Sequence, residues 1–187
     1  MLTNARIMPG WHWPAVAEFH GYTGDCTQDA LMAALAASRN LPPTPAWLNS
    51  ITSEMIARHM AAPSGGTTIA NVAEYARGYG YPIIAEYDYQ EPLQVDVQSL
   101  LNENAGINPI VLQVANGQAL QDDWQHGRDE PGLHYHAIAV LGVLPNGDHI
   151  CMDGDSPASF AGRFCAYSSA VIAAARPCGL LIVGKQV

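Results

Sequence analysis

Residues 134–153, HYHAIAVLGVLPNGDHICMD, contain two apolar stretches joined by a turn signal. The run from His134 to Leu144 predicts an apolar strand, and His149 to Asp153 predicts the strand that returns beside it. Between them, the residues Pro145 to Asp148 include Asn-Gly, the dipeptide typical of tight hairpin turns. The stretch therefore predicts an antiparallel hairpin that begins with histidines and ends with a carboxylate.

The rest of the chain places helices mainly before this hairpin and strands mainly around and after it. Helices are expected from Cys26 to about Ser38, over Pro45–Met60, after the Gly65–Thr68 signal as far as Gly78, over Val95–Asn102 and from Ser168. Further strands are expected over Ile83–Tyr87, Pro109–Ala115, Arg163–Ala166 and Gly179–Val183, and a loop over Asn116–Gly132. This order predicts one α+β domain spanning residues 1–187, with N-terminal helices packed on a C-terminal antiparallel sheet.

Composition excludes several classes of partner. The 187 residues are 49% hydrophobic and 13% charged, which predicts a sizeable buried core. Eight Lys and Arg stand against 17 Asp and Glu, a formal net charge of −9, and the basic residues are scattered singly. Nucleic acids and anionic membranes are therefore poor candidate partners, because both require clustered basic side chains. A monomer is expected.

The sequence also contains no recognisable targeting segment. No stretch approaches the roughly 20 apolar residues that cross a bilayer, and Met1–Gly10 lacks the apolar run of a signal peptide. A cytoplasmic location on synthesis is therefore expected. The four cysteines are widely spaced, which predicts free thiols rather than disulfides or a zinc ribbon.

Cys26 is the first candidate for chemistry. It stands at the predicted start of a helix, where free N–H groups and the helix dipole stabilise a thiolate. Asp25 is the expected N-cap, and Asp29 lies in the first turn, where a carboxylate suits the dipole. The alternative is an inert buried cysteine, the commoner fate of a free thiol.

The hairpin supplies candidate partners for this thiol. His134 and His136 share one face of a strand, because side chains repeat every two residues. Across the hairpin Asp153 could hold one imidazole in place. A strand rises roughly 3.3 Å per residue, so Asp155 should overshoot the histidine by roughly 7 Å unless the loop folds back. Alternatives stay open for each residue. The histidines can be residues at the sheet edge whose hydrogen bonds are satisfied locally, and the aspartate can be a turn residue bonded to its own backbone. His134 and His136 can also ligate a metal ion, with Asp153 or Cys151 as further ligands.

The order of these features resembles that of papain-like cysteine peptidases, most closely the bacteriocin-processing, double-glycine leader peptidase branch and its small stand-alone phage and bacterial relatives. The matching segments, in order along roughly Phe19 to Gly184, are Gly24–Ala30, Gly66–Thr68 with Ala76–Gly80, Asn108–Val111, His136–Gly142 and Cys151–Asp155. Gly142 follows His136 by six residues, as in the family pattern, which favours His136 over His134. The resemblance implies a papain-like fold with Cys26, His136 and Asp153 as catalytic residues.

The chain departs from the family pattern at three places. Thr27 follows Cys26 where the family usually has glycine, and His20 stands where the family has an oxyanion-hole glutamine. An imidazole can donate a hydrogen bond to an oxyanion, so His20 is the candidate substitute, its alternative being a surface loop residue. Two acids, Asp153 and Asp155, stand where the family often has Asp-Pro, which leaves the orienting residue open.

The resemblance implies a cysteine-dependent amide-bond hydrolase that needs no metal or organic cofactor. Its substrate would be a peptide or the peptide part of peptidoglycan, cut by a lysin-type enzyme that reaches the cell wall on release. The acidic charge gives no attraction to anionic wall polymers, so a protein substrate stays open. The alternatives are a non-catalytic binding or structural module with the same fold, and a metal-dependent hydrolase built on His134, His136 and Asp153.

Overall fold

The computed structural model describes residues 5–8, 25–124, 135–156 and 165–186. Within these residues there are six helices: α1 (Cys26–Arg39), α2 (Pro45–Ala57), α3 (Ile69–Gly78), α4 (Val97–Asn104), α5 (Gln118–Trp124) and α7 (Ser169–Ala174). The same residues form seven strands: β1 (Arg6–Ile7), β2 (Ile83–Tyr87), β3 (Ile110–Val114), β4 (His136–Val143), β5 (His149–Met152), β6 (Cys165–Tyr167) and β7 (Pro177–Val183).

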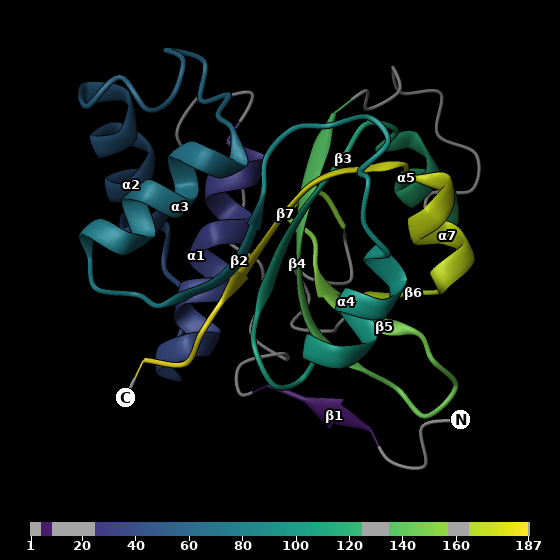
Figure 1. The fold of residues 1–187 in the computed structure, drawn as a ribbon. Coiled ribbons are helices and arrows are strands. Elements are labelled where there is room, and N and C mark those ends of the chain that lie inside the picture. Colours follow the sequence, from purple (N-terminus) through teal and green to yellow (C-terminus); the bar gives the residue numbers. More distant parts are fainter. Residues whose placement is uncertain (1–4, 9–24, 125–134, 157–164, 187) are drawn as a thin grey trace.

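The strands form one sheet in the order β2-β7-β3-β4-β5-β6, with β1 paired to β4. Every pairing between described strands is antiparallel. The C-terminal strand β7 lies between β2 and β3 (Figure 1), and β3 in turn pairs with β4 of the hairpin, so the last strand of the chain lies inside the sheet. The predicted α+β class is confirmed.

Two helical layers cover the two faces of this sheet. Helices α1, α2 and α3 lie on one side and α4, α5 and α7 on the other (Figure 1). Alternate residues of β4 enter the two cores: Ala137, Ala139 and Leu141 pack toward α1, and Ile138 and Val140 toward the opposite core. Because both faces are covered, β4 is buried along its whole length, which explains its nearly continuous apolar sequence.

Helix α1 is the central helix and carries the candidate nucleophile at its first residue. Residues Thr27–Ser38 are all buried. Asp25 is the N-cap, as predicted, although its side chain makes no capping hydrogen bond. The helix ends at Asn40, which adopts the left-handed conformation with φ 54° and so terminates the helix without glycine.

The hairpin forms as the turn signal predicts. The N–H of Leu144 donates to the carbonyl of Asp148 at 2.8 Å, and Gly147 takes a φ of 91°, which glycine adopts without strain. A register shift between Val140 and Gly142 displaces the pairing of β4 with β5. The return strand ends at Met152, one residue earlier than predicted, so Asp153 opens the loop that follows.

Other predicted boundaries differ in detail. The loop expected from Asn116 contains helix α5, which the polar composition of that segment conceals. The second helix ends at Ala57 rather than Met60, and the helix expected over Val95–Asn102 spans Val97–Asn104. Strand β1 was not anticipated from its two residues. Within the part of the chain that the structure describes, no helix has the length and apolarity needed to cross a bilayer.

Candidate active site

The thiol of Cys26 meets the imidazole of His136 where the first turn of α1 passes the start of β4. His136 is the first residue of β4 and pairs with Val114 of β3, which fixes its backbone within the sheet. Its side chain is buried and lines the same cleft as Cys26, whose thiol helps to raise the pKa of the imidazole. Cys26 is half-buried, whereas the other three cysteines are buried. The structure therefore brings these two sequence-predicted residues together.

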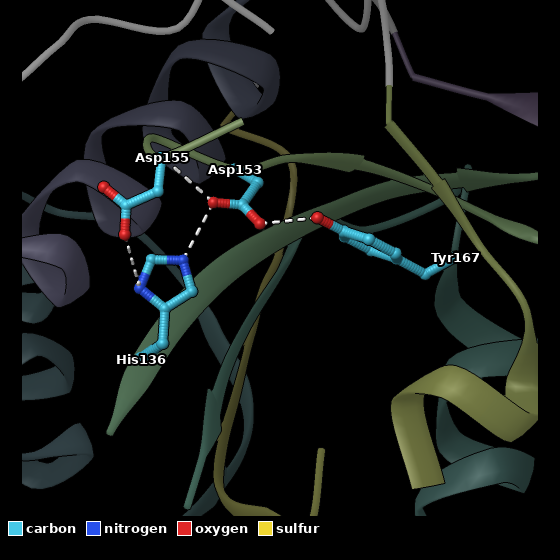
Figure 2. Close-up of polar contacts among 4 residues, drawn as sticks. All are labelled: His136, Asp153, Asp155 and Tyr167. Carbon is cyan, nitrogen blue, oxygen red and sulfur yellow. Dashed lines mark hydrogen bonds and ion pairs between the residues drawn. The ribbon is translucent and has the colours of Figure 1, made fainter. Parts of the chain in front are cut away.

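The second nitrogen of His136 faces Asp153. Nε2 lies 2.8 Å from Oδ1 of Asp153. The same carboxylate accepts a hydrogen bond from the Tyr167 hydroxyl at 2.6 Å and another from the N–H of Asp155 at 3.0 Å (Figure 2). Asp153 is fully buried and receives donors from three directions. Such a carboxylate is held rigidly, so it can fix the orientation of the imidazole.

Burial and the contact between His136 and Asp153 have opposite effects on the pKa of each side chain. Burial alone lowers the pKa of His136, but the charge and hydrogen bond of Asp153, together with Cys26, outweigh it and hold that pKa well above its usual value. Burial raises the pKa of Asp153, but His136, the Tyr167 hydroxyl and the Asp155 N–H reverse this effect, so its pKa is lowered. The pair therefore favours an imidazolium beside an ionised carboxylate, which suits a neighbouring thiolate.

Asp155 also reaches His136, on the ring nitrogen opposite Asp153. Its Oδ2 lies 3.5 Å from Nδ1 of His136 (Figure 2). The expectation that Asp155 overshoots the histidine is wrong. Ala139 of β4 lies opposite Met152 of β5, and three further residues along each segment bring position 155 level with His136. The N–H of Ser156 donates to the carbonyl of Asp153, and this turn folds the loop back.

A third carboxylate, that of Asp29, lies in the same region. Asp29 is on α1, one turn after Cys26, and is only 6% exposed. Burial first, and then the nearby charges of Asp25 and Asp153, raise its pKa well above the usual value, although His136 acts in the opposite sense. From the sequence, the Asp29 carboxylate is expected to interact favourably with the dipole of α1, whereas in the structure its side chain is buried.

A cleft of about 410 Å³ opens beside Cys26 and His136. Its lining is uncharged apart from His136 among the described residues, and consists of Cys26, Thr27, Gly66, Thr67, Thr68, Tyr89, Gln113, Val114, Tyr135, His136 and Cys178. Residues 66–68 form one wall and precede α3. A cleft whose lining includes a thiol and an imidazole, and otherwise no charged side chain among the described residues, can hold a peptide segment with a carbonyl beside sulfur.

Two amide side chains, that of the partly buried Gln113 and that of the buried Gln28, hold the cleft walls in place. Nε2 of Gln113 in β3 donates to Oγ1 of Thr27 at 3.0 Å and to the carbonyl of Thr67 at 3.1 Å. The amide of Gln28 in α1 donates to the carbonyl of Gly65. The start of α1 and the 65–68 wall are thus tied to each other through β3.

Two predicted residues lie outside the described part of the chain. These are His20, the candidate oxyanion donor, and His134, the alternative histidine. The metal-site alternative keeps a partial basis, because ligating atoms of His136, Asp153 and Asp155 all lie within 4.8 Å of one another. Cys151, the other ligand suggested for a metal site, is buried, and its thiol donates a hydrogen bond to the carbonyl of His149. Hydrogen bonding accounts for the position of Asp153 without an ion.

Sequence reasoning missed Tyr167 and Gln113. It placed Asp29 correctly in the first turn of α1 but did not foresee the burial of its side chain. Tyr167 is the last residue of a single short strand and carries no motif, and Gln113 is one polar residue within an apolar strand. A glutamine that interrupts a predicted buried strand is a usable signal, because a buried amide requires partners. Nothing in the sequence points to Tyr167.

Comparison with known proteins adds no family assignment. No protein-family model matches the chain, and no curated protein matches it. The chemistry of the site is therefore inferred from its own geometry.

Proposed function

We propose that this protein is a cysteine-dependent hydrolase of amide bonds. One observation carries the proposal: a half-buried thiol at a helix start lies beside a buried imidazole whose other nitrogen is held at 2.8 Å by a buried carboxylate. Cys26, His136 and Asp153 thus have the geometry of a nucleophile, a general base and an orienting acid. The adjoining neutral cleft gives a substrate carbonyl access to the sulfur.

In the proposed reaction, the Cys26 thiolate attacks the carbonyl carbon and forms a tetrahedral adduct. His136, which holds the proton taken from the thiol, returns it to the leaving amine as the carbon–nitrogen bond breaks. Water then attacks the resulting thioester, giving one proton to His136, and the acid is released as the thiol regains its proton. Asp153 keeps the imidazole aligned throughout and stabilises its charged form.

The oxyanion requires donors close to the sulfur. The N–H of Cys26, at the first position of α1, has no intrahelical acceptor, since the first N–H groups of a helix are left unpaired. We assign it as one donor. His20 stays the proposed second donor from the sequence pattern.

The fold supports assigning the protein to the papain-like type. A thiol on the central helix faces an antiparallel sheet, and the histidine and the acid follow in that order from β4 and the end of β5. This chain order accompanies the sequence resemblance of the same segments. The papain-like assignment rests on that combination.

The substrate class proposed is an uncharged peptide segment, either in a protein or in the peptide part of peptidoglycan. The neutral lining of the cleft favours side chains without charge. The net charge of −9 gives no electrostatic attraction to anionic wall polymers, so recognition would come from the cleft itself.

The test is digestion of purified peptidoglycan and of an unfolded protein by the full-length chain, with mass spectrometry of the products. We expect new amide-bond cleavage products that disappear with Cys26→Ala, and the variant Cys165→Ala, at a buried cysteine outside the cleft, serves as the matched thiol control. Cleavage that persists in Cys26→Ala, or no cleavage of either substrate, would contradict the proposal and favour a non-catalytic module.

A further inference from the structure

Two buried thiols lie opposite each other in strands β5 and β6 of the sheet. In the antiparallel pairing of these strands, Cys151 is the direct partner of Cys165. Both residues are buried and belong to the core cluster on the side of α4, α5 and α7, whereas Cys26 packs against the cluster on the other side of the sheet. The described residues therefore include a cysteine pair that is separate from the candidate active site.

The register places Cys151 and Cys165 within the range that a disulfide spans. Directly opposite residues of antiparallel strands have Cα atoms about 4.5 or 5.5 Å apart, and disulfides join Cα atoms that are roughly 4.4–6.8 Å apart. The side chains of such a pair point to the same face of the sheet. Their Cβ atoms lie about 4.5–5.5 Å apart, so an approach of about 1 Å reaches the usual disulfide distance.

The surroundings of the two sulfurs permit this small approach. The Cys151 thiol donates a weak hydrogen bond, at 3.5 Å, to the carbonyl of His149, which a rotation of the side chain breaks at little cost. Burial, and then the nearby Cys165 and Asp153, raise the pKa of the Cys151 thiol, as expected where two sulfurs share one buried space. Strand β6 spans Cys165–Tyr167 and pairs with β5 alone among the described strands. A short strand at the edge of a sheet is held by few hydrogen bonds, so it can shift toward its neighbour.

We propose that Cys151 and Cys165 form a disulfide when the protein meets an oxidising environment. The oxidant is a small disulfide such as oxidised glutathione. One cysteine thiolate attacks it, forms a mixed disulfide and releases one glutathione thiolate, and the second cysteine thiolate then attacks the protein sulfur of that mixed disulfide and displaces the other glutathione. Two cysteine thiols are thereby oxidised, one glutathione disulfide is reduced to two thiols, and the two cysteine protons pass to the glutathione sulfurs.

This bond fastens the edge strand to the sheet beside the candidate active site. It closes a loop of about 15 residues, and such a link stabilises the folded chain by restricting the unfolded one. Each cysteine lies two residues before one member of the hydrogen bond from Tyr167 to Asp153. The bond therefore also restrains the two segments that hold the orienting carboxylate. That benefit to the active site rests on the proposed hydrolase, whereas the disulfide does not.

The test is to refold the reduced full-length chain in a glutathione redox buffer and to map its disulfides. Refolding gives the oxidant access to both thiols before the core covers them. Free thiols are trapped with iodoacetamide, and the linked peptides are identified by mass spectrometry. We expect the bond between Cys151 and Cys165 to be the dominant linkage within the chain. Its absence, or a dominant linkage that involves Cys26 or Cys178, overturns the proposal.

A second readout is Tm, the midpoint of thermal unfolding, measured by circular dichroism. The oxidised chain should unfold roughly 6–12 °C above the reduced chain, the scale for a loop of this length in a chain of this size. Cys165→Ala should lose this difference, whereas the matched control Cys178→Ala, at a buried cysteine outside the pair, should keep it. Each variant is compared with its own reduced form, so any cost of the substitution to the fold cancels. An equal Tm for the two forms of the unaltered chain overturns the stabilising role. Neither readout measures amide cleavage, so the outcome is independent of that for the hydrolase.

Discussion

Cys26 differs from the other cysteines in exposure and in its partner. It is half-buried and lines the cleft beside His136, whereas Cys151 and Cys178 are buried. Burial raises the pKa of both of these thiols, that of Cys178 to about 11. We expect iodoacetamide at pH 7 to label Cys26 at least about tenfold faster than Cys151, Cys165 or Cys178 in the folded protein. Peptide mapping by mass spectrometry measures the four rates. Equal labelling of all four cysteines would remove Cys26 as the nucleophile.

The two carboxylates around His136 should contribute unequally to catalysis. Asp153 bonds Nε2 at 2.8 Å and is fully buried, whereas Asp155 lies 3.5 Å from Nδ1 and is partly exposed. We expect Asp153→Asn to lower kcat/KM by on the order of 10²–10⁴-fold, the range for a general acid–base contribution, and Asp155→Asn to lower it by less than about fivefold. The reverse ranking in steady-state kinetics would make Asp155 the orienting residue.

Tyr167 should act through Asp153. Its hydroxyl donates to Oδ2 of that carboxylate at 2.6 Å. Removing one donor leaves the others in place, so Tyr167→Phe should reduce kcat/KM by about three- to thirtyfold, less than Asp153→Asn. Kinetics of the double variant test the coupling: if the two effects multiply fully, Tyr167 does not act through Asp153.

At the scale of the elements, β5 carries a buried histidine that makes stability depend on pH. His149 is fully buried, with Nε2 3.0 Å from the Gln98 amide. Burial lowers its pKa, and the charge of Asp148 only partly opposes this. The unfolded chain therefore binds a proton near pH 6.5 that the folded chain does not, so this contribution to stability is complete above that pH and is lost as the pH falls.

The matching prediction concerns the variant His149→Gln. As the pH falls from 7.5 to 5.5, His149 should lower the free energy of unfolding by at most about 1.4 kcal/mol for each pH unit below 6.5. Each kcal/mol lost lowers Tm by roughly 2–4 °C. His149→Gln should therefore have a flatter dependence of Tm on pH than the unaltered chain, measured by circular dichroism. His59→Asn, at an exposed position, is the control and should keep the original slope. Parallel slopes for all three proteins would show that His149 is not buried as a neutral group.

At the scale of the whole molecule, one side chain joins three separate segments around the cleft. Gln113 of β3 bonds Thr27 at the start of α1 and Thr67 in the opposite wall. We expect Gln113→Leu to raise KM and lower kcat/KM by about tenfold, since each lost hydrogen bond frees one wall. The exposed Gln94→Leu is the control. Unchanged kinetics in Gln113→Leu would show that the walls keep their positions without this amide.

The sequence by itself determined the elements that depend on neighbouring residues. The Asn-Gly turn, the apolar run of β4 and the helix start at Cys26 are local signals, and the residues 83–87 form β2 within the predicted bounds. The hairpin, which returns its far end to its beginning, also made Asp153 a candidate partner of the histidines, whereas the choice of Cys26, His136 and Asp153 as a set came from the resemblance to papain-like peptidases. Local backbone preferences and side-chain periodicity are sufficient for the helix, strand and turn predictions.

Only the tertiary structure decided the features that arise from contacts between distant segments. The register shift in β4 and the turn after Met152 bring Asp155 to His136, the short strand β6 presents Tyr167 to Asp153, and β7 enters the sheet beside β3. Packing of α1 against the sheet turns Asp29 inward beside other carboxylates, where the sequence predicts only a favourable helix dipole. The physical reason is that burial, and with it the protonation and pairing of a side chain, is a property of the packed surroundings and not of the local sequence.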